Sequence, residues 1–216
     1  MLREAVDGLR VVAADPILRA IAISTITFEL SFQCVVAVIN LFSLRELGFT
    51  PGVVGMIYGV GGVSSLLGAL LADRAGRWLG VGPAMVLGAL SMGMSILLLP
   101  LAPTASLVGA AILIAQQLGG DGAYTIYDVN QLSLRQTITP QHMLGRVNGS
   151  FRVGSLGAML VGSLLGGVLG DNLGLRPTLV VGGSGVVVGA ILLALSPVRS
   201  LRRAPVPEVS LAEPGG

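Results

Sequence analysis

The sequence has little charge and no lysine. Only 11% of its 216 residues are charged, against about 25% in typical soluble domains, and all 13 basic residues are arginines. A net charge of +2 is too small to indicate a nucleic-acid-binding protein. The single cysteine, Cys34, excludes an intramolecular disulfide and a cysteine metal cluster. Since no zinc or phosphate-loop pattern occurs either, the sequence predicts neither a metal site nor a cofactor.

Apolar residues dominate the composition of the sequence. They make up 53% of the chain, and the mean hydropathy is +0.85. A helix crosses a bilayer with about 20 apolar residues. Short links rich in Gly and Pro separate the apolar segments, so the sequence predicts an all-α, polytopic membrane bundle of six antiparallel transmembrane helices. The predicted spans are Ile17–Leu41, Gly52–Ala72, Gly82–Leu101, Ala105–Gln131, Asn148–Gly170 and Thr178–Ser196.

The distribution of arginine predicts how the chain is divided and oriented. Residues 1–16 are expected to form an amphipathic cytoplasmic lead-in, residues 17–197 the transmembrane domain, and residues 198–216 a disordered cytoplasmic tail. All arginines except Arg45 and Arg176 fall at one face of the predicted membrane domain. Because arginine accumulates on the cytoplasmic side, both termini are expected there, in the cell membrane of a bacterium.

Within the fourth apolar segment, the stretch Ser106–Gln131 carries polar residues at spacings of four and three. At about 100° per residue these positions form one stripe of a helix. A charged side chain at the bilayer centre costs about 2.5–3.5 kcal/mol on insertion scales, so the stripe is expected to face protein or a watery cavity. Its members are Gln117, Asp121, Tyr124, Asp128 and Gln131.

The first apolar segment has a similar stripe, made of Thr25, Glu29, Gln33 and Asn40. The two striped segments hold equivalent places in successive three-helix units, which suggests an internal three-plus-three repeat. Glycines four residues apart predict close helix packing. They occur in the second segment at Gly55 and Gly59, and in the fifth at Gly162, Gly166 and Gly170.

Two polar stretches carry a resemblance to a known family. Residues 68–77 read GALLADRAGR, after the second apolar segment. Residues 135–140 read RQTITP, and residues 144–148 read LGRVN, between the fourth and fifth segments. These stretches resemble inner loops of the major facilitator superfamily. They are most similar to those in the C-terminal six-helix half of drug and macrolide exporters and enterobactin exporters.

The resemblance implies roles for particular residues. In that superfamily the first and fourth helices of each half line the substrate cavity. The candidate cavity residues are Thr25, Gln33, Gln117, Tyr124 and Asp128, while Tyr127 lies off the stripe and is as compatible with packing as with binding. Glu29 and Asp121 are the candidates for proton coupling, since a desolvated carboxyl group can exchange a proton near neutrality.

The loop motif is expected to help hold one conformation of a transport cycle. Its candidate residues are Gly68, Asp73, Arg74, Gly76, Arg77 and Arg146. Asp73 is expected beside the positive N-terminal end of the fifth helix, which is predicted to begin near Thr139 and Pro140.

The predicted function is proton-coupled efflux of a small amphipathic compound such as a drug, macrolide or siderophore, with a role in multidrug resistance. The expected partners are the lipid bilayer, the substrate, protons and a second six-helix half, either a missing N-terminal half or a second copy. The alternative is a truncated or non-transporting half with a structural or regulatory role. An enzyme is not expected: Ser184 lies in a GGSG stretch like that of intramembrane serine proteases, but the only histidine, His142, is in an inner loop.

Overall fold

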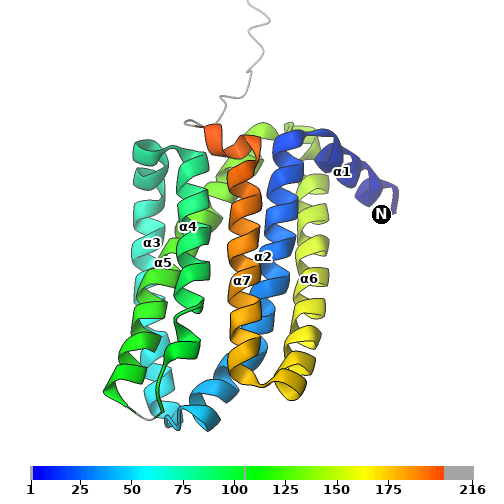
Figure 1. Ribbon diagram of the computed structural model, residues 1–216. Helices are drawn as coiled ribbons and strands as arrows, with labels where there is room; N and C mark the ends of the chain where they lie inside the picture. Colours follow the sequence, from blue (N-terminus) through cyan, green and yellow to red (C-terminus); the bar gives the residue numbers. More distant parts are fainter. Residues whose placement is uncertain (1, 105, 202–216) are drawn as a thin grey trace, which may run out of the picture.

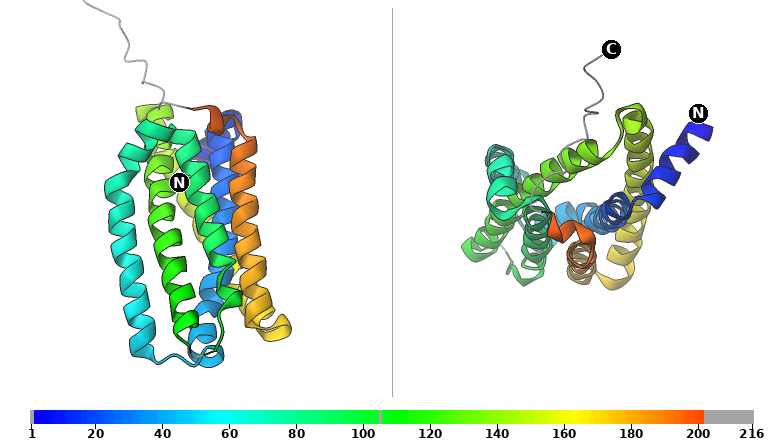
Figure 2. Two further views of the ribbon diagram at one scale, coloured as in Figure 1. Left: turned by 60° about the vertical axis from the view of Figure 1, so that its left-hand side comes forward. Right: turned by 90° about the horizontal axis from the view of Figure 1, so that it is seen from above.

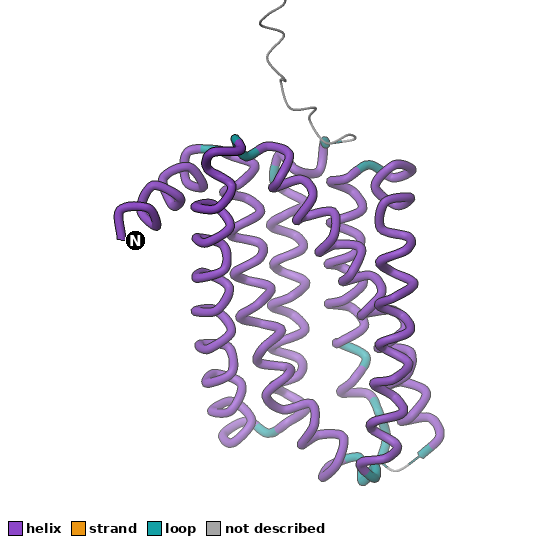
Figure 3. The backbone as a smooth tube through the Cα atoms, turned by 180° about the vertical axis from the view of Figure 1, so that it is seen from behind, coloured by secondary structure: helices purple, strands orange, loops and turns teal. Residues whose placement is uncertain are grey.

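The computed structural model describes residues 2–104 and 106–201, and these residues form helices with no strand. The described part forms one bundle of long helices, with most loops at the two ends (Figures 1 and 3). The α-helices span Leu2–Ala14 (α1), Pro16–Leu41 (α2), Pro51–Leu79 (α3), Val81–Ile96 (α4), Leu107–Ile138 (α5), Leu144–Leu173 (α6) and Leu175–Leu195 (α7). Shorter helical turns occupy Phe42–Glu46 (η1), Leu99–Leu101 (η2), Gln141–Met143 (η3) and Pro197–Ser200 (η4).

Both described chain ends lie at one end of the bundle, which we name the terminal end; the opposite one is the far end (Figure 1). At the terminal end α1 packs against α6 and projects away from the bundle. Asp15 separates α1 from α2, because its Oδ1 accepts hydrogen bonds from the Ile17 and Leu18 amides, both at 2.8 Å. Pro16 then occupies the first turn of α2, where its missing N–H costs nothing.

Five stretches among the described residues are long and apolar enough to cross a membrane. They correspond to five of the six predicted spans, and they confirm a multi-pass helical membrane protein. The fourth predicted span is the exception, because the polar residues of α5 lower its hydropathy. A count of six crossings therefore stays a prediction. The five stretches are Pro16–Glu46, Pro51–Leu79, Val81–Leu101, Gln141–Leu173 and Leu175–Leu195.

Several predicted boundaries are wrong. Helix α3 continues past Ala72 to Leu79, so the 68–77 motif is helical and the turn follows at Gly80. Helix α6 begins at Leu144 rather than near Thr139 and Pro140, which connect α5 to η3. The predicted tail also begins too early: η4 is folded, and the Gly82 amide donates to the Leu201 carbonyl at 3.0 Å. The rest of that tail, 202–216, lies outside the described residues.

The long helices pack as two groups of three. Helix α5 packs against both α3 and α4, while α2 packs against both α6 and α7; α4 and α7 join the groups. Seen from above, the two groups stand side by side (Figure 2). The two groups have the same packing pattern. In this pattern α2 is equivalent to α5, α3 to α6 and α4 to α7. Because α2 starts at the terminal end and α5 at the far end, the two units are inverted relative to each other (Figure 1).

The turns of the two units also match. Gly80 links α3 to α4 at φ 96°, and Gly174 links α6 to α7 at φ 94°, a conformation that favours glycine. The surrounding residues read GRWLGVGP at 76–83 and GDNLGLRP at 170–177. This shared G-x-x-L-G-x-x-P pattern is a residue-level trace of the repeat that the sequence analysis did not identify. The packing, the turns and this pattern together support the predicted three-plus-three organisation.

Small buried residues let α3 approach α5 closely. A methyl group at Gly68 would overlap the Gly122 backbone, and one at Gly76 would overlap the Asn130 side chain. Ser64 Oγ accepts from the Gly122 amide at 3.1 Å and donates to the Leu118 carbonyl at 3.0 Å. The contacts therefore run through small residues of α3, as in other membrane helix pairs.

The glycine predictions have mixed outcomes. Gly162 and Gly166 do pack against the α2 backbone, at Leu30 and Cys34, which confirms the prediction for α6. Gly55 and Gly59 face open space within this chain, so the prediction for α3 is wrong there. The small residues that pack lie on a different face of the same helix.

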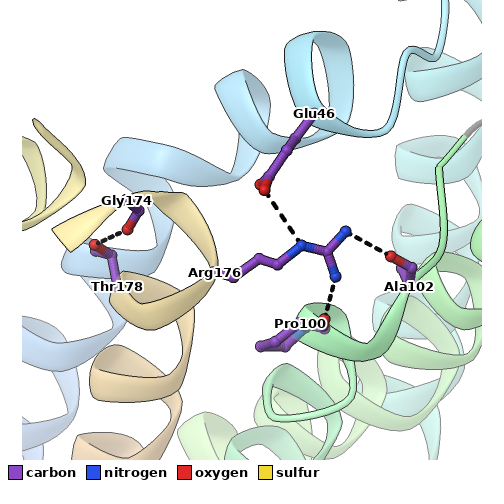
Figure 4. Close-up of polar contacts among 6 residues, drawn as sticks. All are labelled: Glu46, Pro100, Ala102, Gly174, Arg176 and Thr178. Carbon is purple, nitrogen blue, oxygen red and sulfur yellow. Dashed lines mark hydrogen bonds and ion pairs between the residues drawn. The ribbon is translucent and has the colours of Figure 1, made fainter.

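Arg176 clamps three segments together at the far end (Figure 4). Its Nε donates to Glu46 Oε1 in η1 at 3.2 Å, and its two terminal nitrogens donate to the carbonyls of Ala102, at 2.9 Å, and Pro100. The guanidinium also lies 5.3 Å from the centre of the Phe42 ring. One arginine thus holds the end of α2, the link between α4 and α5, and the start of α7.

Substituting valine for Gly68 should destabilise the bundle, because the added methyl groups would push α3 away from α5. Overpacking costs about 1–3 kcal/mol, and each kcal/mol shifts the melting midpoint by about 2–4 °C in a chain of this size. Cys34 is buried, so its labelling by a fluorescent maleimide during heating reports unfolding. Gly59→Val is the matched control on the same helix. Equal midpoints for the two variants would contradict the packing account.

Replacing Arg176 with methionine or lysine should loosen the far end. Lysine keeps the charge but lacks the planar fork that reaches three acceptors. Hydrogen bonds to charged groups contribute about 1.5–3 kcal/mol each, and partial exposure of the pair reduces that value. Hydrogen–deuterium exchange should rise in Leu99–Leu101 for both variants and stay unchanged at the terminal end. Arg45→Met, at an exposed arginine of the same region, should leave exchange as in the parent; unaltered exchange in the Arg176 variants would argue against the clamp.

Candidate functional site

The polar faces of α2 and α5 meet through their side chains. Thr25 Oγ1 lies 3.3 Å from the Tyr127 hydroxyl, and Gln131 Nε2 donates to the same Thr25 oxygen at 3.3 Å. The two helices predicted to carry facing stripes are therefore linked by hydrogen bonds. We name this contact the α2–α5 seam; it comprises Thr25, Phe28, Glu29 and Phe32 of α2 and Tyr124, Tyr127, Asp128 and Gln131 of α5.

Aromatic rings form the centre of the seam. Phe28 stacks on Tyr124 with ring centres 5.0 Å apart and on Tyr127 at 5.7 Å, while Phe32 lies 6.2 Å from Tyr124. Such pairs add about 0.5–1.5 kcal/mol each beyond the area they bury. Tyr127 is off the predicted stripe, yet it both stacks and reaches Thr25. Phe28 and Phe32 had no sequence signal beyond their spacing along α2.

Three charged groups border the rings. Glu29, half-buried on α2, and Asp128, exposed on α5, repel each other electrostatically. Arg135 attracts Asp128, and its guanidinium lies 4.4 Å from the centre of the Phe151 ring on α6. Arg135 was predicted to lie in an inner loop. Because α5 continues to Ile138, Arg135 instead belongs to the helix and borders the seam.

Gln117 and Asp121 face a different neighbour from the rest of the stripe. A methyl group at Gly61 of α3 would overlap both side chains, so they pack against α3. Gln117 is buried and Asp121 is half-buried. The α5 stripe therefore faces α3 in its far half and α2 in its terminal half. The Cβ atom of Gln33 lies close to Gly162 of α6.

A cavity of about 620 Å³ adjoins the seam at the terminal end. Helices α1, α2 and α6 and the turn η3 line it. Most of its wall is apolar, with Val12, Ile26 and Val153 among the lining residues. It shares Thr25 and Phe151 with the groups just described. Of the predicted cavity residues, Thr25 alone lines this cavity, and Arg146 of the loop motif lines it too.

Asp73 does not lie beside α6 in this chain. It forms an ion pair with Arg77, one turn along α3, and both side chains are exposed. Helices α3 and α6 stand on opposite sides of the bundle, with the other long helices between them (Figures 1 and 2). The predicted contact between Asp73 and the start of the fifth helix is therefore wrong within this chain.

Comparison with known proteins agrees with this architecture. The sequence model of the family described as transmembrane secretion effector, a major facilitator family, matches residues 1–214. The chain belongs to the major facilitator superfamily. An uncharacterized MFS-type transporter, y4rN, of Sinorhizobium fredii is 30% identical over 180 residues, which are 80% of this chain and 42% of the relative. The chain thus spans less than half the length of this superfamily relative.

Membership confirms the broader part of the resemblance noted in the sequence. The superfamily consists of membrane transporters rather than enzymes, and the helical spans agree with a multi-pass membrane protein. Membership leaves the branch, the substrate and the coupling ion as proposals.

Tyr127→Phe should separate the two contributions of Tyr127 to the seam. The ring stack would remain, but the hydroxyl would no longer meet Thr25. A hydrogen bond contributes about 0.5–1.5 kcal/mol net, so the melting midpoint should fall by a few degrees. Tyr127→Ala should lower it further, since large aromatic truncations cost about 3–5 kcal/mol. If the phenylalanine and alanine variants have equal melting midpoints, the hydroxyl rather than the ring supplies most of the stability that Tyr127 contributes, contrary to this expectation.

Proposed function

We propose that this chain is the C-terminal six-helix half of a superfamily exporter that moves a small amphipathic compound out of the cell in exchange for protons. The observation that carries the proposal is the α2–α5 seam, where Thr25, Tyr127 and Gln131 join two polar helices inside an otherwise apolar bundle. Polar groups are costly within a membrane, and in membrane proteins they mark substrate and ion pathways. Drugs, macrolides and siderophores are the candidate substrates. Export of drugs would give the protein a role in multidrug resistance.

Glu29 and Asp121 are the proposed proton carriers. Glu29 is at the middle of α2 and Asp121 near the middle of α5, so each is far from the aqueous ends. A carboxyl group binds a proton more readily when it is removed from water and releases it when water returns. Rocking of the helices during transport would expose each group to one side at a time. Asp128 and the phenols of Tyr124 and Tyr127 are the ionisable groups that interact with Glu29 among the described residues.

The cavity supports an amphipathic substrate. Its volume of about 620 Å³ falls within the range of about 300–1,000 Å³ typical of small-molecule sites. Its apolar walls suit the hydrophobic part of such a substrate, and Thr25 supplies a polar group at the side of the cavity that adjoins the seam. The candidates Gln33, Gln117, Tyr124 and Asp128 would contact substrate in conformations other than the one described.

The loop motif is proposed to control the conformational cycle. The Asp73–Arg77 pair is exposed at the terminal end of α3, where a second half could offer Asp73 another partner. Gly68 and Gly76 would keep α3 close to α5 during that change, and Arg74 and Arg146 would hold the terminal end on the cytoplasmic side. The second half is proposed to be an N-terminal half or a parallel second copy, with both chain ends in the cytoplasm.

The alternative proposal is a truncated or non-transporting half with a structural or regulatory role. Transport by membranes that contain the chain separates the two proposals.

Everted vesicles from cells that make the chain, alone or with a six-helix partner half, provide the test. A cationic dye, a neutral macrolide and an anionic siderophore would be added in turn, and a pH-sensitive dye would report proton release. We expect release with at least one compound, and its loss in Glu29→Gln and Asp121→Asn. Asp171→Asn, at an exposed acid far from the seam, is the control. Full retention in both variants would exclude these carboxylates as carriers, and no release with any compound would favour the non-transporting half.

A further inference from the structure

We propose that the cavity at the terminal end, between α1, α2, α6 and η3, binds an amphipathic anion whose negative group is held by His142 and Arg146. We name it the terminal cavity. The inference rests on the proposed function and deepens it, because it names the substrate class of the same cavity. It is tested by binding, which does not require transport.

The side chains that line the terminal cavity carry charge of one sign. His142 of η3 and Arg146 in the first turn of α6 are basic, and none of the lining residues that the structure describes is acidic. Both side chains belong to exposed residues, so a ligand in the cavity can reach them. A guanidinium has five N–H donors, so Arg146 can hold an anion in addition to its present contacts, and an imidazole keeps an N–H donor when it is neutral.

The start of α6 adds partial positive charge at the same place. Helix α6 has Met143 at its N-cap, which forms no side-chain capping bond. The first amides of a long helix point outward with a partial positive charge. Gly145 lines the cavity in this first turn, and a methyl group there would meet no atom within 4 Å. An acidic group can therefore approach the backbone here as well as the two basic side chains.

The part of the terminal cavity farther along α6 is apolar. Ile26 of α2 and Val153 of α6 line it, and they are 43% and 70% exposed although both are hydrophobic. Val153 lies seven residues beyond Arg146, which is about 10 Å along the helix. The cavity thus has a basic end and an apolar body, as an acid with a hydrocarbon tail requires.

Compounds of other charge suit the terminal cavity less well. A cation would lie beside Arg146 with no carboxylate among the described lining residues to offset the repulsion. A neutral amphiphile would bury the same tail, but its hydrogen bonds would lack the second charge of an ion pair, and charge-assisted bonds are about twice as strong. A preference for the anion at equal tail length is therefore the measurable consequence.

Photochemical labelling tests this preference. The full chain in phosphatidylcholine nanodiscs would be labelled with a dodecanoate that carries a diazirine near its methyl end, and mass spectrometry would locate the cross-links. Unlabelled dodecanoate, dodecanol and dodecyltrimethylammonium would compete, each at its membrane concentration measured with empty nanodiscs. We expect cross-links at lining residues such as Ile26 and Val153, and dodecanoate to compete at about tenfold lower concentration than the other two. Equal competition, or cross-links only outside the cavity, would overturn the proposal.

Two substitutions test the basic end. Arg146→Gln should weaken competition by dodecanoate about tenfold, His142→Gln should weaken it less, and both should leave competition by dodecanol unchanged. Unchanged dodecanol competition also shows that the cavity is intact. Arg152→Gln is the matched control, since Arg152 is an exposed arginine of the same helix that is not among the lining residues. A full preference for dodecanoate in the double variant of His142 and Arg146 would contradict their role.

A second pair of variants tests the location. A methyl group at Gly149, which lines the cavity, or at Gly157, which is not among the lining residues, would meet no atom within 4 Å. Leucine therefore enters both positions of α6 without overlap, but only Gly149→Leu fills the cavity. We expect cross-linking to be lost in Gly149→Leu and retained in Gly157→Leu. Equal cross-linking of the two variants would overturn the location.

Further arms identify the source of the anion and separate the inference from transport. Displacement of the probe by phosphatidylglycerol in the nanodiscs would assign the cavity to an anionic lipid of the bilayer, and no displacement would assign it to a free single-chain anion; both results keep the inference. Selective dodecanoate binding without proton release in vesicles would keep it and remove the proposed function. Proton-coupled export of a neutral or cationic compound without selective dodecanoate binding would do the reverse.

Discussion

The fold depends on how a polar helix is held inside an apolar bundle. Lipid offers no hydrogen-bond partners, so the side chains of α5 must find theirs within the protein. Asn130 does so by donating to the Ala72 carbonyl of α3 at 3.0 Å and to the Ile126 carbonyl of its own helix at 2.9 Å. Such reach is short, which requires the backbones of α3 and α5 to lie close together. The small residues of α3 meet that requirement, and the polar content of α5 thereby determines its neighbour.

The same constraint explains what could be predicted from the sequence. Hydropathy predicts the spans because membrane thickness sets helix length, and the four-and-three spacing predicts a striped helix because it follows the helical period. Spacing does not tell which face of a helix meets which partner. Gly55 and Gly59 have the same separation as Gly68 and Ala72, yet the first pair is exposed and the second pair is buried. That difference arises only when α5 packs against one face of α3.

The helical spacing of polar residues predicted the stripes of the candidate site but not all of their neighbours. The stripes of α2 and α5 do meet, at Thr25 and Gln131, as the equivalent places of two three-helix units suggest. The stripe of α5 divides between two neighbours, because Gln117 and Asp121 face α3 whereas Gln131 reaches α2, an arrangement that no single-helix pattern contains. Arg135 was assigned to a loop because the helix was expected to end at Gln131, where the apolar run ends. The added turns place its guanidinium on the Phe151 ring.

The two inverted units are alike in packing and unlike in polarity. In one unit the close contact between α3 and α5 includes Gln117, Asp121 and Asn130; in the other, α6 meets α2 at Leu30 and Cys34. Equivalent packing holds both contacts, so polar side chains at one of them are not needed to join the helices. Burying them carries a cost that the apolar contact avoids. Packing alone therefore does not explain the polar side chains that α5 turns toward α3, in keeping with the proposed role of Asp121 in proton coupling.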